Sequence, residues 1–166
     1  MRQHSTAFVL AIAVSAGVAT ASATVLVPAD FETVVNGSGL IVHGRVVDVR
    51  SAVTAPRGGI ETFVTVAVVD AFKGNPGASV TFRVPNGQVG RYRRVIVGAP
   101  EFAEGDEVVV FLRGQAPAMP ALFGLSQGVY RVTRPAGVPA VVTRARPPVP
   151  LAAFAREIDV ILEGRR

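Results

Sequence analysis

The segment 124–128, GLSQG, spells G-x-S-x-G, the pattern that surrounds the nucleophile of many serine hydrolases. In those enzymes a helix begins just after the serine, and the acid and the histidine follow later in the chain. The residues after Ser126 instead alternate between β-branched or aromatic and polar types, which predicts a strand over 129–133. We therefore expect Gly124 and Gly128 to allow backbone bends at a tight link or bulge before that strand.

A hydrolase interpretation would have to pair Ser126 with His43, because no histidine follows residue 126 and the other histidine lies at position 4. Histidine also precedes serine in chymotrypsin-like enzymes, but their catalytic residues span two barrels in a much longer chain. We predict that the protein is not an enzyme and has no catalytic residues. A serine hydrolase that uses Ser126 and His43 is kept as an alternative.

Metal ligands are sparse in this sequence. The chain has no cysteine, and a lone histidine cannot form a structural zinc site without other ligands. The acidic residues Glu101, Glu104, Asp106 and Glu107 are close in sequence but lack the spacing of a calcium loop. We predict a solvated loop there, and neither a metal site nor a cofactor.

Basic and aromatic residues come together once, in the segment 91–94, RYRR. On an exposed barrel strand they could bind single-stranded nucleic acid, but the predicted export of the chain argues against that partner. Arginines can also simply protect a sheet edge, or bind an anionic polymer of the cell envelope. The candidate binding residues are Arg91, Tyr92, Arg93, Arg94, Ser126 and Gln127.

Charge supports either interpretation of those arginines. The chain has 17 basic and 12 acidic residues, a formal net charge of +5, and Lys73 is its one lysine. Such an arginine excess is expected from a GC-rich genome and also from an anion-binding surface, so composition does not separate the two.

The N-terminus has the three parts of a signal peptide in the usual order. Arg2 is basic, residues 7–18 form an apolar run too short to span a bilayer, and Ala21-Ser22-Ala23 fits the cleavage rule. A buried N-terminal helix is the alternative. We predict cleavage after Ala23 and export to the periplasm or the medium, with the oligomeric state open.

The remaining chain reads as one mainly β domain. A short helix is expected over 30–37 and an amphipathic helix from 151 to 162, packed on the domain. A change of phase near 46–47 predicts a bulge, and apolar residues on both faces of 107–112 predict a central strand. Strands are expected over 40–50, 61–70, 79–84, 92–97, 107–112, 129–133 and 140–144.

These features predict an all-β fold, an OB-like closed or nearly closed β-barrel with one helix at each end. Its parts are the signal peptide 1–23, the barrel domain 24–146 and a proline-rich lead-in with the closing helix, 147–166. The leading function is a non-enzymatic domain that binds a protein or an anionic polymer in the envelope or outside. An accessory or inhibitor of an exported protease is an alternative.

Two resemblances rest on the segments 40–49, 62–75, 98–114 and 124–132. Together they resemble small exported bacterial proteins of uncharacterised function that share a GL[A/S]QGx[F/Y]xV segment, which implies a β-barrel but no activity. The first two segments also resemble netrin/TIMP-type OB domains, with V-x-G-x-V and V-x-x-x-F-K-G patterns. Those domains use cysteines that this chain lacks, so that resemblance implies a fold only.

Overall fold

The computed structural model of the chain describes residues 28–54, 59–114, 118–142 and 147–164. The predicted signal peptide, 1–23, and the last two residues of the predicted strand 140–144 lie outside these ranges. Within them, no helix is long and apolar enough to cross a membrane.

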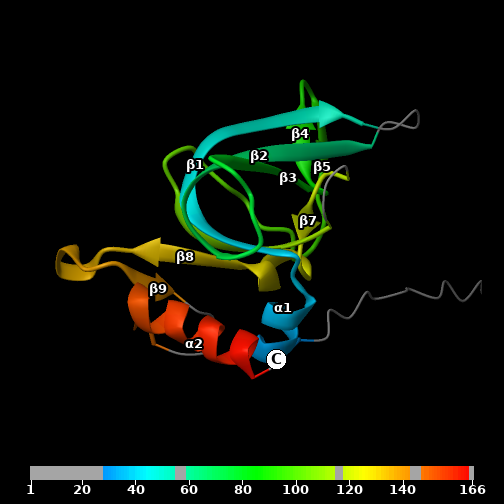
Figure 1. Cartoon of the computed structure of the whole chain (residues 1–166). Coiled ribbons are helices and arrows are strands. Elements are labelled where there is room, and N and C mark those ends of the chain that lie inside the picture. The colour runs from blue at the N-terminus through cyan, green and yellow to red at the C-terminus, as the bar shows by residue number, and fades with distance from the viewer. Residues whose placement is uncertain (1–27, 55–58, 115–117, 143–146, 165–166) are drawn as a thin grey trace, which may run out of the picture.

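The described elements follow the predicted order, with several short additions (Figure 1). The helices are α1 (Phe31–Gly37) and α2 (Leu151–Glu163), with 3-10 turns η1 (Leu125–Gly128) and η2 (Pro135–Gly137). The strands are β1 (Leu40–Val53), β2 (Ile60–Lys73), β3 (Ser79–Val84), β4 (Gly87–Val89), β5 (Tyr92–Arg94), β6 (Glu107–Arg113), β7 (Ala121–Leu122), β8 (Val129–Thr133), β9 (Ala140–Val142) and β10 (Val149–Pro150).

Five strands of the described chain close a barrel in the order β1-β2-β3-β7-β6, and β6 pairs back onto β1. All neighbours are antiparallel except β3 and β7, which are parallel and meet at a single residue pair, Arg83 and Ala121. The predicted OB-like closed barrel is confirmed. Beyond β7 the chain passes through η1 into β8, which leaves the barrel and pairs with β6 and β9.

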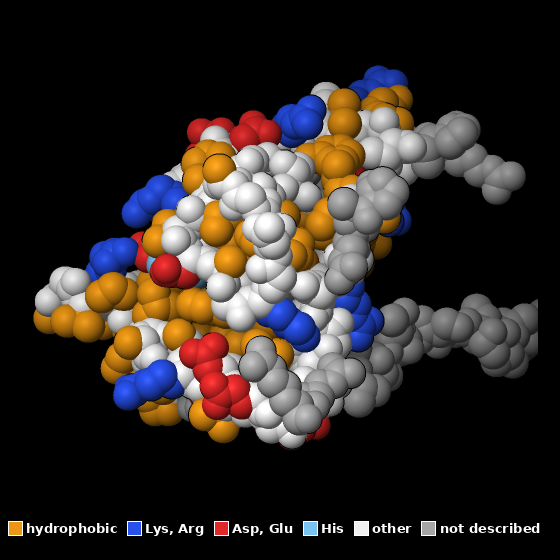
Figure 2. Space-filling view, viewed as in Figure 1, with side chains coloured by type: hydrophobic (Ala, Val, Ile, Leu, Met, Phe, Trp, Pro, Cys, Tyr) orange, Lys and Arg blue, Asp and Glu red, His pale blue; other side chains and the backbone are white. Residues whose placement is uncertain are grey.

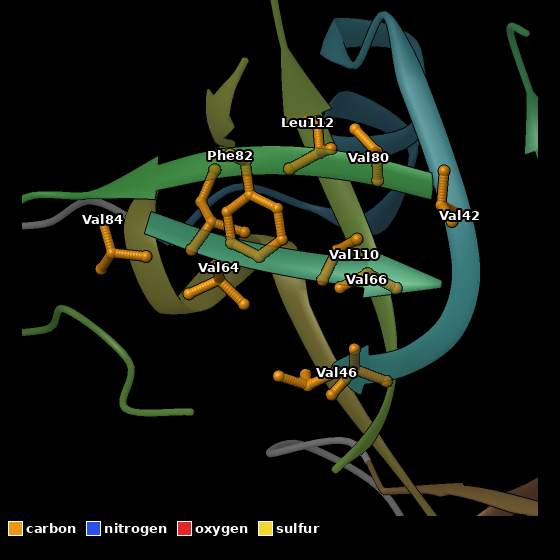
Figure 3. Packing of buried hydrophobic residues seen from close by; sticks show 11 residues of the cluster. Val42, Val46, Val64, Val66, Val80, Phe82, Val84, Val110 and Leu112 are labelled. Carbon is orange, nitrogen blue, oxygen red and sulfur yellow. The ribbon is translucent and has the colours of Figure 1, made fainter. Parts of the chain in front are cut away.

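The barrel interior is filled by alternate side chains of its long strands (Figure 3). Val64 and Val66 of β2 and Phe82 of β3 point inward toward Val110 and Leu112 of β6, and all five are fully buried. The alternation predicted for 79–84 is confirmed, because Val80, Phe82 and Val84 are buried while Arg83 is exposed.

A second core lies between the barrel and the helices. Val109 and Phe111 of β6 point out of the barrel and pack with Val35 of α1 and with Phe154 and Ile158 of α2. In Figure 2 this interface is seen from the side as a band of hydrophobic side chains between β8 and α2. The central strand and the packed closing helix are therefore both confirmed.

Irregular pairing bends β1 around the barrel, as Figure 1 shows. The pairing with β2 shifts between Val46 and Asp48, so the bulge predicted near 46–47 is confirmed. Gly44 lies at a second shift, and a Cβ there would come within 2.2 Å of the Ala67 carbonyl oxygen. The close approach of β2 to β1 thus requires glycine at this position.

One predicted strand needs correction. The strand expected over 92–97 ends at Arg94, and Val95 and Val97 are exposed at 68% and 95% because the chain turns there instead of pairing. The tight link expected before 129–133 is the 3-10 turn η1.

Candidate functional site

The β4–β5 hairpin lies over the C-terminal end of β1 and the N-terminal end of β2. Hydroxyl side chains of these two strands hold it there. Thr62 Oγ1 donates to the Asn86 carbonyl oxygen at 2.8 Å and lies 2.9 Å from Ser51 Oγ, which accepts from the Gln88 amide at 3.4 Å. A Cβ on Gly87 would come within 2.6 Å of Ser51 Oγ and 2.7 Å of Thr62 Oγ1. Glycine at this position therefore allows the hairpin to reach the hydroxyl pair, and the hydrogen bonds fix it there.

A cleft of about 380 Å³ lies between this hairpin, the ends of β1 and β2, and the segment 99–102. We call it the hairpin cleft. Val49, Ile96 and Phe102 line it together with polar residues, among them Arg93 and Arg94. Its size lies within the range of ligand sites.

The four predicted residues of 91–94 separate into two pairs. Arg93 and Arg94 line the cleft; Arg93 Nη2 lies 3.3 Å from Glu101 Oε1, and Arg94 Nη1 reaches the Ile60 carbonyl oxygen at 3.5 Å. Arg91 instead lies over the ring of Tyr92, 5.1 Å from its centre, and donates to its hydroxyl at 2.9 Å. Neither Arg91 nor Tyr92 is among the described residues that line the cleft.

Ser126 and Gln127 lie elsewhere, in the η1 turn between β7 and β8. The Gln127 side chain accepts a hydrogen bond from the Ala29 amide at 2.6 Å, which ties the segment before α1 to the turn. The Ser126 amide donates to the Gly98 carbonyl oxygen at 3.1 Å, and its side chain is buried. The structure therefore does not bring these two residues into the hairpin cleft with Arg93 and Arg94.

The two glycines of GLSQG have different structural roles. Gly124 has a φ of 51°, in the left-handed region that glycine adopts without strain. Gly128 has no space for a side chain, since a Cβ would lie 2.6 Å from the Phe123 carbonyl oxygen and 2.8 Å from that of Phe111. The pattern that suggested a nucleophile is explained by the backbone turn it makes.

His43 is the buried centre of a cluster of polar side chains on the outside of the barrel. Its Nδ1 lies 3.1 Å from Asp70 Oδ2 and its Nε2 lies 3.0 Å from Glu107 Oε1. Glu107 in turn accepts from Arg134, with both carboxylate oxygens at 2.7 Å from Nη2. The cluster joins β1, β2 and β6 to the segment after β8, and His43 itself is buried.

Two adjacent carboxyl groups, Asp106 and Glu107 at the start of β6, have pKa values below the ordinary range. Burial raises the pKa of Glu107, but the hydrogen bonds and charges of Arg134 and His43 outweigh it and hold the pKa below 4.5. Burial likewise raises the pKa of Asp106, and the Ala103 amide with Arg131 brings it below 3.8. Both groups are therefore ionised structural partners at neutral pH.

The hydrolase alternative requires contact between Ser126 and His43. Both ring nitrogens of His43 already face carboxylates, and Ser126 Oγ has no hydrogen-bond partner among the described residues. The part of the chain that the structure describes also contains no cluster of three His, Cys, Asp or Glu side chains able to hold a metal ion. The hairpin cleft is thus the best candidate site.

Comparisons with protein-family models, with curated proteins and with solved structures find no match for this chain. The resemblances drawn from its sequence segments stay predictions, and function has to be argued from the geometry of the hairpin cleft. Of that cleft, sequence reasoning identified Arg93 and Arg94 but missed the hydroxyl pair and the wall at 99–102. The sequence contained one local signal of this arrangement, Gly87 between Asn86 and Gln88. A glycine at such a position can indicate that another part of the backbone approaches closely.

Proposed function

We propose that this chain is an exported, non-enzymatic binding domain that holds an acidic macromolecule, a protein or an anionic polymer, at the hairpin cleft. The observation that supports it is that Arg93 and Arg94 both line a cleft that also contains apolar side chains. Guanidinium groups pair with carboxylates and phosphates through two parallel hydrogen bonds, which gives both affinity and orientation. The net positive charge, +5 for the full chain and one less once Arg2 is removed with the signal peptide, would also attract an acidic partner from a distance.

The chemistry of the cleft favours binding over catalysis. The described residues that line it include two hydroxyl side chains, Ser51 and Thr62, but no histidine or cysteine. Their hydrogen bonds go to one another and to the hairpin backbone instead of to a general base. The cleft therefore offers cations, amides, apolar side chains and one carboxylate, Glu101, that is already paired with Arg93, which together favour holding a ligand over activating it.

Direct titration tests this proposal. The protein purified after export is titrated with fluorescent polyglutamate and with polyphosphate at low salt, and anisotropy reports binding. The double variant R93Q/R94Q should lose at least about tenfold in affinity, because each charged hydrogen bond contributes about 1.5–3 kcal/mol. The control R83Q/R156Q removes the same charge from exposed arginines that do not line the cleft.

An equal loss in both double variants would show that net charge alone attracts the probes and would contradict a site at the cleft. Failure of the wild-type protein to bind either probe would also contradict the proposal. The predicted export is tested in a separate experiment. Mass spectrometry of protein recovered outside the cytoplasm should show a chain that begins at Thr24.

A further inference from the structure

We infer that the ligand of the hairpin cleft is an extended acidic peptide segment of a partner protein, and that Glu101 takes the place of the peptide's carboxylate on Arg93 in the unbound protein. The inference rests on the proposed function and names the partner class for the same site. Three observations support it: the cleft runs along the segment 93–96, exposed apolar side chains lie among its polar ones, and Arg93 is already paired with a carboxylate.

One side of the cleft is a continuous segment of chain. The four consecutive residues 93–96 all line it. Arg93 and Arg94 are the last residues of β5, and Val95 and Ile96 continue beyond its end. In the described chain β5 pairs with β4 alone, which leaves the other edge of β5 as a place where an extended peptide can add.

The apolar surface at the cleft favours a peptide over a phosphate polymer. Val49, Ile96 and Phe102 line its walls, and Val95 and Val97 continue the same segment with exposed fractions of 68% and 95%. A polyphosphate chain has no apolar group to cover these side chains. A peptide in which acidic and aliphatic residues alternate would place carboxylates on Arg93 and Arg94 and bury the valines.

Glu101 is held in position to mimic such a carboxylate. Its neighbour Pro100 accepts a hydrogen bond from the Asn86 side chain at 3.1 Å, and its own carbonyl oxygen accepts from Arg131 at 2.6 Å. Between these two contacts, Glu101 Oε1 lies 3.3 Å from Arg93 Nη2. The Glu101 and Arg93 side chains are 80% and 62% exposed, so exchange for another carboxylate costs little.

The test uses a fluorescent peptide of alternating glutamate and valine as the probe. E101Q should raise its affinity about two- to fivefold, the range expected when an exposed ion pair no longer competes. E104Q removes the same charge from an exposed residue that is not among the described residues lining the cleft. It should raise the affinity for the peptide less than E101Q does. R93Q should weaken binding, and the gain from E101Q should disappear when R93Q is also present.

The role of Glu101 would be overturned if E101Q and E104Q raised the affinity for the peptide equally. It would also be overturned if E101Q still raised the affinity in the double variant R93Q/E101Q. If polyphosphate binds through Arg93 and Arg94 and the peptide does not bind, the ligand is not a peptide. That result would overturn the inference but not the proposed function. If neither probe binds, the proposed function fails together with the inference. A peptide of alternating lysine and valine should not bind, and its binding would also overturn the inference.

Discussion

The cluster around His43 makes a quantitative prediction through the variant E107Q. Glutamine has the shape of glutamate and can still accept from His43, but it removes the charge that faces Arg134 and the imidazole ring. The Glu107 side chain is only 10% exposed, so water cannot fully replace the lost interactions. The cluster should therefore contribute measurably to stability.

The magnitude follows from the contacts that are lost. A hydrogen bond to a charged group contributes about 1.5–3 kcal/mol, and Arg134 donates to both oxygens of Glu107 at 2.7 Å. The Arg134 side chain is 49% exposed, which lowers its share through solvent screening. We expect E107Q to lower the free energy of unfolding by about 2 kcal/mol at neutral pH.

The pH dependence gives the sharper test. Because the pKa of Glu107 is held below 4.5 in the folded protein, its charge contributes stability that is fully present above 4.5 and is lost as the pH falls through the folded pKa. Urea unfolding of wild type and E107Q should therefore differ most above pH 4.5 and converge below it. E104Q, an exposed carboxylate, serves as the control. A difference that does not change with pH would refute the electrostatic reasoning.

Three further predictions concern packing. G128A should destabilise the protein by about 1–3 kcal/mol in urea unfolding, because the added Cβ would press on fixed carbonyl oxygens. The control G164A should have little effect, because the atom nearest to its added Cβ lies 3.5 Å away. F154A should cost about 3–5 kcal/mol in the same assay, since the ring is fully buried between α2 and the barrel. Q127A should speed hydrogen exchange at the Ala29 amide, which loses its partner, and unchanged exchange would contradict that contact.

The fold was predictable where the pattern of apolar residues in a single strand shows which faces of that strand are buried. The alternation of 79–84 gives β3, and the apolar faces of 107–112 give a strand with a core on each side. The segment 95–97 has the same β-branched residues but no strand to pair with, so its propensity is not realised. Propensity thus predicts a strand only where the tertiary fold supplies a partner.

The candidate site was only partly predictable, because its members are brought together by strand register. Ser51 of β1 lies opposite Thr62 of β2, and no local pattern indicates that these two hydroxyl groups will meet. Arg93 and Arg94 could be selected from charge alone. Ser126 and Gln127 were selected from a short pattern that also describes a glycine-bounded turn, and the turn is what it forms.

The most direct test of the hairpin cleft is a map of amide chemical shifts in the full protein on addition of the glutamate–valine peptide. The account predicts that the changes concentrate in 86–88, 93–96 and 99–102, the backbone around the cleft. Changes concentrated at α1 and α2, or spread evenly over the basic surface, would contradict it.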